Sequence, residues 1–323
     1  MNGLISPNLG LDLVRITESA ALTAGRWMGL GKPDMAHSHA TEAMLLAFEQ
    51  LNIDGSVVIS EEIPSKDFSQ IDSGLKVGTG QGPEMDVVAD PIDGTGLLAK
   101  GHSDAISVVG IAPRGSMWAP YPARYMEKIV VDREAADVLV PECIDAPAAW
   151  TLALVARAKD KEVRDLVVFL LDRPRHEDLI EEIRAAGARV MLRSQGDIVG
   201  ALMAVTEDVN TDLMMGVGGV SEGLISACAI KSMGGAMLGR LAPQSEEEHN
   251  AVLEAGLDMK QILSCDQLVA GSDIFFAATG ITDGTVLKGV HYHGDHAETE
   301  SLLIRCKTGK RRLVHAGHLL EEE

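Results

Sequence analysis

The chain has 323 residues, of which 46% are hydrophobic and 3% are aromatic, and its formal net charge at pH 7 is −20. This length favours two domains, or one large one, with a sizeable core. The negative charge argues against nucleic acid or an anionic membrane surface as a partner, and the scarcity of aromatic residues argues against a stacking surface for single-stranded nucleic acid.

The cysteines and the N-terminus give two further expectations. The four cysteines are far apart and lack zinc-site spacing, which favours reduced thiols in a cytoplasmic protein. The first ten residues contain no basic segment followed by a long apolar run, and no stretch reaches about 18 consecutive apolar residues. We therefore expect neither a signal peptide nor a membrane span.

Two helices and a strand are predicted at the start of the chain. Apolar residues recur with helical spacing over 11–27 and again over 39–51, with glycines and a proline between them. A turn then precedes an apolar strand over 57–60, which leads into two carboxylates, Glu61 and Glu62.

The clearest functional signal follows a predicted strand over 86–89. The strand ends in Asp90, and Pro91 is expected to stop it because proline has no N–H for the ladder. Asp93 comes two residues later, followed by a glycine and by the hydroxyl of Thr95 at the start of a predicted helix. Carboxylates there can hold a divalent cation, and backbone N–H groups at a helix start can point at a phosphate.

Asp-Pro and Asp-Gly pairs are also ordinary turn formers, so this segment alone leaves a simple turn as an equal alternative. The acids at 61 and 62 favour the metal interpretation, because two strands can bring their terminal carboxylates to one sheet edge.

Two segments are predicted to connect elements rather than to form helices or strands. Residues 76–83 are rich in glycine but lack the Lys-Ser/Thr pair of a P-loop, which favours a turn between strands. Residues 137–150 contain prolines and acids with little periodicity, which indicates a linker. We therefore expect an N-terminal domain over 1–140, which contains the candidate metal- and phosphate-binding motif, and a C-terminal domain over 141–323.

The second half alternates strand and helix patterns, which predicts an α/β fold. Strands are expected over 106–112 and 125–131 before the linker, and over 166–171, 189–192, 212–216, 274–278, 287–290, 300–306 and 313–315 after it. Helices are expected over 152–156, 179–186, 198–205 and 224–233, with a solvated helix around 246–248.

Oxygen ligands from Asp and Glu suit Mg²⁺ or Mn²⁺ rather than Zn²⁺. The candidate ligands are Glu61, Asp90, Asp93 and the carbonyl oxygen of Ile92. Glu222, just past a Gly-Gly pair at a predicted helix start, is a further candidate, although a glutamate there also favours the helix dipole without any ligand.

Other polar side chains have a functional and a plain structural interpretation. Thr95 could orient an attacking water or could cap a helix. Lys128, Arg173 and Arg175 lie near predicted strand ends, where they could bind a substrate phosphate or remain solvated charges.

Three histidines stand close together near the C-terminus. The spacing of His291, His293 and His296 is compatible with zinc or copper binding, whereas their neighbours favour a hairpin loop. The sequence is compatible with a metal site and with a plain hairpin.

The motif from Asp90 to Thr95, together with Glu61, resembles the signature of the lithium-sensitive, metal-dependent phosphomonoesterases, which include inositol monophosphatases and fructose-1,6-bisphosphatases. Further segments resemble one branch, the class II fructose-1,6-bisphosphatases of bacteria, in order along nearly the whole chain. They are residues 15–22, 52–55, 76–80, 125–128, 173–176, 218–223, 278–282 and 302–305.

The resemblance implies a layered α-β-α-β-α sugar-phosphatase fold with two domains. It implies a cytoplasmic enzyme, expected to be a homo-oligomer, that uses Mn²⁺ or Mg²⁺ to hydrolyse the 1-phosphate of fructose 1,6-bisphosphate in gluconeogenesis. Some relatives also take sedoheptulose 1,7-bisphosphate.

By position, the resemblance places metal ligands at Glu61, Asp90, Asp93 and Glu222, with His37 at a further metal position. Catalytic roles would fall to Thr95, Glu61 and Asp90. Contacts to the sugar bisphosphate are expected from Asp93, Gly94, Thr95, Tyr125, Arg173, Pro174, Arg175, Gln195, Gly196, Asp197 and Gly219.

The chain departs from the family pattern at several of these positions. Pro33 replaces a lysine, His37 replaces a metal-site aspartate, and Asp93 replaces a glutamate, as in inositol monophosphatases; Arg173 and Gln195 replace a lysine and an aspartate. Histidine binds Mn²⁺ or Zn²⁺ better than Mg²⁺. A phosphatase of another sugar or polyol phosphate, or a weakly active paralogue with a binding role, therefore remains an alternative.

Overall fold

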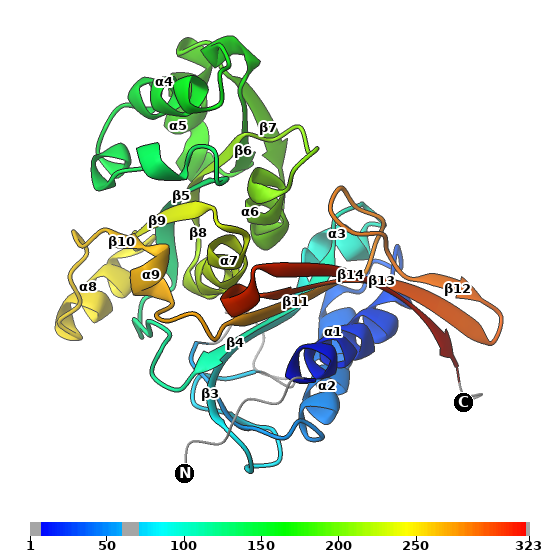
Figure 1. The fold of residues 1–323 in the computed structure, drawn as a ribbon. Helices are drawn as coiled ribbons and strands as arrows, with labels where there is room; N and C mark the ends of the chain where they lie inside the picture. Colours follow the sequence, from blue (N-terminus) through cyan, green and yellow to red (C-terminus); the bar gives the residue numbers. More distant parts are fainter. Residues whose placement is uncertain (1–7, 60–70, 321–323) are drawn as a thin grey trace. The chain divides into compact units, whose positions relative to one another are not determined.

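The computed structural model describes residues 8–59 and 71–320. The chain forms two compact units, the first from Met1–Met117 with Ser272–Glu323 and the second from Trp118–Gly271. The predicted α/β class is confirmed, since each unit contains its own sheet and helices (Figure 1). The second unit begins at Trp118, so residue 140, the expected boundary, lies inside it. The last strands of the chain, β11 to β14, belong to the first sheet.

Among the described residues, the sheet of the first unit has eight strands in the order β12-β13-β11-β4-β3-β1-β2, with β14 paired to β13. Its strands are β1 (Asp54–Val57), β2 (Lys76–Val77), β3 (Glu84–Asp93), β4 (Ile106–Pro113), β11 (Phe275–Gly280), β12 (His291–His293), β13 (His296–Arg305) and β14 (Lys310–Leu319). Its helices are α1 (Leu9–Gly25), α2 (Pro33–Phe48), α3 (Thr95–Ala99) and the 3₁₀ turn η5 (Cys306–Thr308).

Helices α1 and α2 lie side by side against the first sheet, in the blue part of Figure 1. Their apolar stripes bury Leu13, Ile16, Met44 and Phe48, which form one core with the inner face of the sheet. Pro33 is the first residue of α2, so that helix starts six residues earlier than expected. A proline fits there because the first helical N–H has no partner within the helix.

The sheet of the second unit has six strands in the order β10-β9-β5-β8-β6-β7. Its strands are β5 (Tyr125–Val131), β6 (Val167–Leu171), β7 (Arg189–Arg193), β8 (Leu213–Gly219), β9 (Ala236–Leu241) and β10 (Leu263–Ser264). Its α-helices are α4 (Ala148–Ala158), α5 (Glu177–Ala185), α6 (Asp197–Val205), α7 (Val220–Met233), α8 (Glu246–Glu254) and α9 (Cys265–Leu268). Its 3₁₀ turns are η1 (Ala136–Val138), η2 (Pro141–Ile144), η3 (Val163–Asp165) and η4 (Pro174–His176).

Four expectations about individual elements were wrong. The strand expected over 57–60 is β1, which already ends at Val57. Residues 287–290 are not a strand; the strand there is β12, which starts at His291. Pro91 does not end β3, as described below. Glu248 is buried rather than solvated, because its carboxylate accepts hydrogen bonds from the backbone N–H groups of Arg124, Tyr125 and Gln244. Over residues 8–59 and 71–320, no helix has the length and apolar character that crossing a membrane requires.

A buried glycine in α6 gives a test of packing in the second unit. A Cβ added at Gly200 would lie 2.2 Å from Cε1 of Phe169, whereas one at Gly317 would have no neighbour within 4 Å. Gly200→Ala is expected to destabilise the protein by about 1–3 kcal/mol through overpacking, although Gly→Ala in a free helix stabilises. Gly317→Ala, the control, should change stability by less than about 0.5 kcal/mol. Urea unfolding of the two variants measures both values, and a Gly200→Ala protein as stable as wild type would contradict the packing.

Candidate active site

Strand β3 carries Asp90 and Asp93 through a β-bulge. In the pairing with β4, Asp90 is opposite Val108 and Asp93 is opposite Ile106, so β3 has one extra residue between the two pairs. Pro91 is tolerated at this point because a bulge leaves a residue unpaired and proline has no N–H to pair. The bulge places two aspartates, 2% and 5% exposed, at the end of one buried strand.

The turn that follows is tied back to the bulge. Ile92 donates its N–H to Oδ1 of Asp90 at 2.8 Å, and the hydroxyl of Thr95 donates to the Ile92 carbonyl at 3.0 Å. Gly94 has φ +94°, and a Cβ there would lie 3.0 Å from Cδ1 of Leu97, so both backbone conformation and space favour glycine. The Ile92 carbonyl, a candidate metal ligand, therefore already accepts one hydrogen bond.

His37 lies on α2, the helix that packs against β3 and α3. Its side chain is buried, and burial lowers the pKa of His37, an effect that Asp34 partly offsets. The imidazole is therefore neutral near pH 7, which is the form that binds metals.

The predicted metal ligands come from different parts of the chain. Glu61 lies outside the described residues, and Glu222 belongs to the second unit. Within residues 8–59 and 71–320, no three His, Cys, Asp or Glu side chains are arranged so that they could hold a metal ion. The donor set at the bulge is nevertheless carboxylate oxygen, which suits a hard cation.

In the second unit, the predicted substrate residues meet at one edge of the sheet. Strands β7 and β8 both run parallel to β6, and β5 runs antiparallel to β8 with Tyr125 opposite Gly219. The carboxyl ends of β6, β7 and β8 and the first residue of β5 therefore share an edge, the place where α/β sheets bind ligands. The residues at these ends are Tyr125, Arg173, Pro174, Arg175, Gln195, Gly196, Asp197, Gly219 and Glu222.

A buried ion pair lies beside this edge. Lys128 on β5 is fully buried and forms a short contact with Oδ2 of Asp197, the first residue of α6. Gly218 leaves room for the pair, because a Cβ there would lie 1.9 Å from that oxygen and 2.8 Å from Nζ of Lys128. Oδ1 of Asp197 is buried without a hydrogen-bond partner among the described residues, so it can accept one from a ligand.

Arg175 and Tyr125 are held next to each other at the same edge. Both Nε and Nη2 of Arg175 donate to the carbonyl of Val217, at 3.2 and 2.9 Å, and its guanidinium lies 5.2 Å from the centre of the Tyr125 ring. The buried carboxylate of Glu248 accepts the N–H of Tyr125 at 3.0 Å. These contacts hold a guanidinium group beside a phenol ring at the strand ends.

Glu222 folds back over the end of β8. A Cβ at Gly219 would lie 1.8 Å from Oε2 of Glu222, and the hydroxyl of Ser221 donates to the same oxygen at 2.6 Å. The close approach explains why glycine stands at 219. It also places a carboxylate at the start of α7, where the helix dipole favours it.

His176 is a structural residue of this edge that the sequence analysis did not single out. Its Nδ1–H donates to the Leu171 carbonyl at 2.7 Å, and its Nε2 accepts the N–H of Val217 at 2.8 Å. The imidazole thus joins the ends of β6 and β8 and must be neutral, and burial lowers its pKa. The available signal was a histidine directly after Pro-Arg at the end of an apolar strand.

Comparison with known proteins adds to this geometry. Residues 7–318 match the family model described as bacterial fructose-1,6-bisphosphatase, glpX-encoded. The chain belongs to this family.

Individual relatives of this fructose-1,6-bisphosphatase family agree along almost their whole length. The chain is 34% identical over 328 residues to the fructose-1,6-bisphosphatase class 2 of Haemophilus influenzae, covering 97% of each chain. It is 35% identical over 336 residues to proteins of two Synechococcus strains named D-fructose 1,6-bisphosphatase class 2/sedoheptulose 1,7-bisphosphatase, covering 96% of this chain and 95% of each relative.

The buried ion pair yields a stability prediction. Lys128→Met leaves the carboxylate of Asp197 buried without its counter-charge, which is expected to cost about 3–5 kcal/mol of unfolding free energy. The matched control is Arg133→Met, because Arg133 pairs with Glu207 at 2.8 Å but both side chains are about 70% exposed, at 69% and 73%. That change should cost less than about 1 kcal/mol. Equal unfolding free energies for the two variants would disprove the role given to Lys128.

His176 makes stability depend on pH. Since its folded pKa is lowered from 6.5, the unfolded chain binds the proton more readily, and the stabilisation present above pH 6.5 is lost as the pH falls. In His176→Gln the melting temperature should therefore fall less between about pH 7.5 and 5.5 than in wild type. Thermal scans at both pH values measure this difference in melting temperature. Part of the pH dependence is expected to remain in the variant, because His37 is also buried. An unchanged difference would show that His176 does not titrate with unfolding.

Proposed function

We propose that the chain hydrolyses the 1-phosphate of fructose 1,6-bisphosphate to give fructose 6-phosphate and phosphate. The observation that carries this is the family match over residues 7–318, together with 34–35% identity over nearly full length to proteins of that name. With the activity we propose a role in gluconeogenesis, a cytoplasmic location and a homo-oligomeric state, all of which rest on the resemblance.

The proposed metal is Mn²⁺ or Mg²⁺, held by Asp90 and Asp93 with Glu61, Glu222 and His37. Four of these five ligands are carboxylates, which fit such cations. When bound, the ion lowers the pKa of a coordinated water and offsets charge on the phosphoryl oxygens. His37 in place of a carboxylate favours Mn²⁺ over Mg²⁺.

The residues of the β3–α3 turn would position the reacting groups. The Thr95 hydroxyl donates a hydrogen bond to the Ile92 carbonyl. The lone pairs of the hydroxyl oxygen can therefore accept a hydrogen bond from an attacking water. The left-handed Gly94 lets the chain turn closely enough to approach a phosphoryl group. Such preorganised groups stabilise developing charge without having to move during the reaction.

The residues at the sheet edge of the second unit would hold the sugar and the second phosphate. The guanidinium groups of Arg173 and Arg175 are suited to bind phosphate oxygens in a bidentate way. Asp197 would accept a sugar hydroxyl through its unpartnered Oδ1, and Tyr125 would contact the substrate beside Arg175.

Sedoheptulose 1,7-bisphosphate is a second candidate substrate, because the two Synechococcus relatives are also named for it. A weakly active paralogue that binds a sugar phosphate is a third possibility, favoured by His37 at a predicted metal position.

Phosphate release by Asp90→Ala tests the proposal. With saturating Mn²⁺ and fructose 1,6-bisphosphate, this variant is expected to lose at least about 100-fold in kcat, since it removes a carboxylate from the proposed metal site. Asp258→Ala, which changes an exposed aspartate in the second unit, is the control and should keep wild-type turnover. Wild-type turnover in Asp90→Ala would show that the ligand assignment is wrong.

The same assay with wild-type protein distinguishes the substrates. Fructose bisphosphate, sedoheptulose bisphosphate, glycerol phosphate and inositol phosphate are each supplied with Mg²⁺ or Mn²⁺. Release from none of them, together with a thermal shift by a sugar phosphate, would replace the enzyme proposal by a binding role. Activity gained in His37→Asp would identify that position as the cause.

A further inference from the structure

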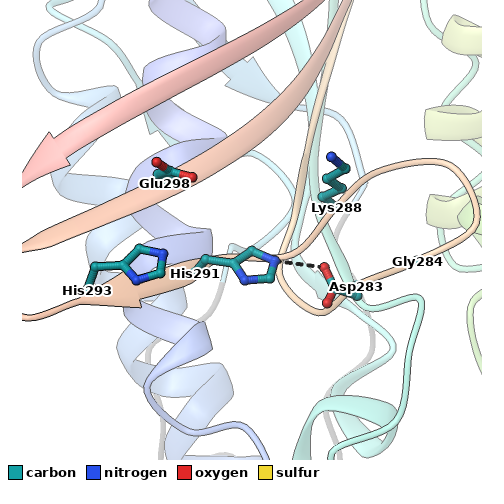
Figure 2. A pocket seen from close by; sticks show the side chains of 6 residues that line it. All are labelled: Asp283, Gly284, Lys288, His291, His293 and Glu298. Carbon is teal, nitrogen blue, oxygen red and sulfur yellow. Dashed lines mark hydrogen bonds and ion pairs between the residues drawn. The ribbon is translucent and has the colours of Figure 1, made fainter.

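Strand β14 forms an open edge of the first sheet. It pairs with β13 over ten residues in one unbroken register, and among the described residues no other strand pairs with it. The other side of β13 carries β12, so the hairpin interpretation of the three histidines is confirmed. Figure 2 shows His291 and His293 on β12, with Glu298 on β13. The outer side of β14 therefore ends the sheet.

The backbone hydrogen-bonding groups of β14 alternate between the two sides of the strand. Leu320, directly after it, donates its N–H to the carbonyl of Asp295 at 2.7 Å, which makes these two residues a hydrogen-bonded pair. Such pairs recur at every second residue of an antiparallel ladder, so the even-numbered residues of β14 bond to β13 and the odd-numbered ones point outward. Among the described residues, the outward N–H and C=O groups have no backbone partner; they belong to Arg311, Leu313, His315, Gly317 and Leu319.

Most of this edge lacks the features that usually keep sheet edges from pairing. Proteins commonly protect an edge with charges, prolines, bulges or a very short strand. β14 has ten residues without a bulge, whereas β2, at the other end of the same sheet, has two. After Arg312 the strand contains no Lys, Arg, Asp, Glu or Pro, and Leu313 and Leu319 are 49% and 73% exposed. An edge of this kind is suited to pair with another strand.

We propose that β14 pairs antiparallel with β14 of a second copy of this chain, about a two-fold axis. With the axis at His315, Leu313 is opposite Gly317 of the second copy. Arg311 is opposite Leu319 in the same way, so all the outward residues of β14 exchange N–H···O bonds with the second copy. The inference rests on the homo-oligomeric state proposed above and names the surface that forms it.

The side chains of the strand fit this register. A Cβ at Gly317 would have no neighbour within 4 Å, so Leu313 of the second copy meets open space there. Leu319 is diagonal to Leu313 across the pair, a separation that long side chains can bridge. The two exposed leucines can therefore cover each other. At the axis, each His315 lies 3.3 Å from Glu300 of its own copy, so a carboxylate accompanies each imidazole.

The charges at the two ends of the strand are complementary when two copies run antiparallel. Three cations stand at its start, Lys310, Arg311 and Arg312, and the sequence continues beyond Leu320 with three glutamates. Among the described residues, none of the three cations has an ion-pair partner. An antiparallel pair brings the cationic start of one strand to the acidic end of the other chain, whereas a parallel pair would set cations against cations. Charge therefore favours the two-fold arrangement.

The test is sedimentation velocity of the full chain over a range of protein concentrations. Leu313→Pro removes an outward N–H from each copy, and proline is tolerated where the N–H of an edge strand faces away from its sheet. The dissociation constant is expected to rise at least about tenfold, because two hydrogen bonds between the copies are lost. Leu313→Lys, which keeps the backbone N–H but places a charge on the edge, should also weaken association. Leu253→Lys is the matched control, since it replaces a leucine 53% exposed on α8 in the other unit and should leave association unchanged.

Hydrogen exchange provides an independent readout of the register. As the protein concentration rises, the amides of the odd-numbered residues of β14 should exchange at least about tenfold more slowly. The amides of the even-numbered residues, already bonded to β13, should change little. Equal protection of both sets at every concentration would contradict the pairing.

Circular dichroism confirms that each variant is folded. The proposal is overturned if wild type stays monomeric at the highest concentration, or if Leu313→Pro and Leu313→Lys associate as tightly as wild type. Phosphate release by the same samples separates this surface from the proposed activity. An inactive protein that associates through β14 would contradict the activity alone, and an active monomer would contradict the surface alone.

Discussion

The pairing of β11 with β4 is the contact on which the first unit depends. Strand β11 comes from residues 275–280, yet it hydrogen-bonds to β4 on one side and to β13 on the other. Thr279 of this strand also bonds the hydroxyls of Thr17 on α1 and Ser301 on β13, at 2.7 and 2.8 Å. A segment far along the chain thus completes the sheet that supports the Asp90–Asp93 bulge.

In the second unit, the packing depends on polar groups that lie close against the backbone of β8. The last four residues of β8 are Gly216, Val217, Gly218 and Gly219, and the glycines leave space for His176, for the Lys128–Asp197 pair and for Glu222 respectively. A side chain at any of the three would occupy the volume of a polar group. The end of β8 therefore carries almost no side chains of its own, and the space beside it is filled by polar groups from neighbouring elements.

Regularly buried elements could be predicted from the sequence, whereas features that depend on distant partners could not. Apolar periodicity located α1, β4, β5 and β6 because each buries a regular face or a continuous run. It could not reveal the bulge at Pro91, since one added residue depends on the partner strand rather than on local pattern. The acidic run at 246–248 was mistaken for a fully solvated segment because the bonds to Glu248 come from residues 124 and 125, far away in sequence.

Candidate site residues were predictable to different degrees. The acids and arginines at strand ends could be identified because strand, turn and charged residue follow one another locally. The burial of Lys128 and the bridging role of His176 depend on β8, which lies about 40 to 90 residues away, and no local pattern carries that information. Position-by-position resemblance named Asp197, but only the fold shows that one of its oxygens is buried without a hydrogen-bond partner among the described residues.

The second unit begins and ends at neighbouring points. The N–H of Trp118, its first residue, donates to the carbonyl of Leu268, three residues before its last, at 2.9 Å. An insertion whose two junctions are adjacent can be exchanged for another of different length without altering the host sheet. A change in the length of the second unit can therefore leave β3, with Asp90 and Asp93, unaltered.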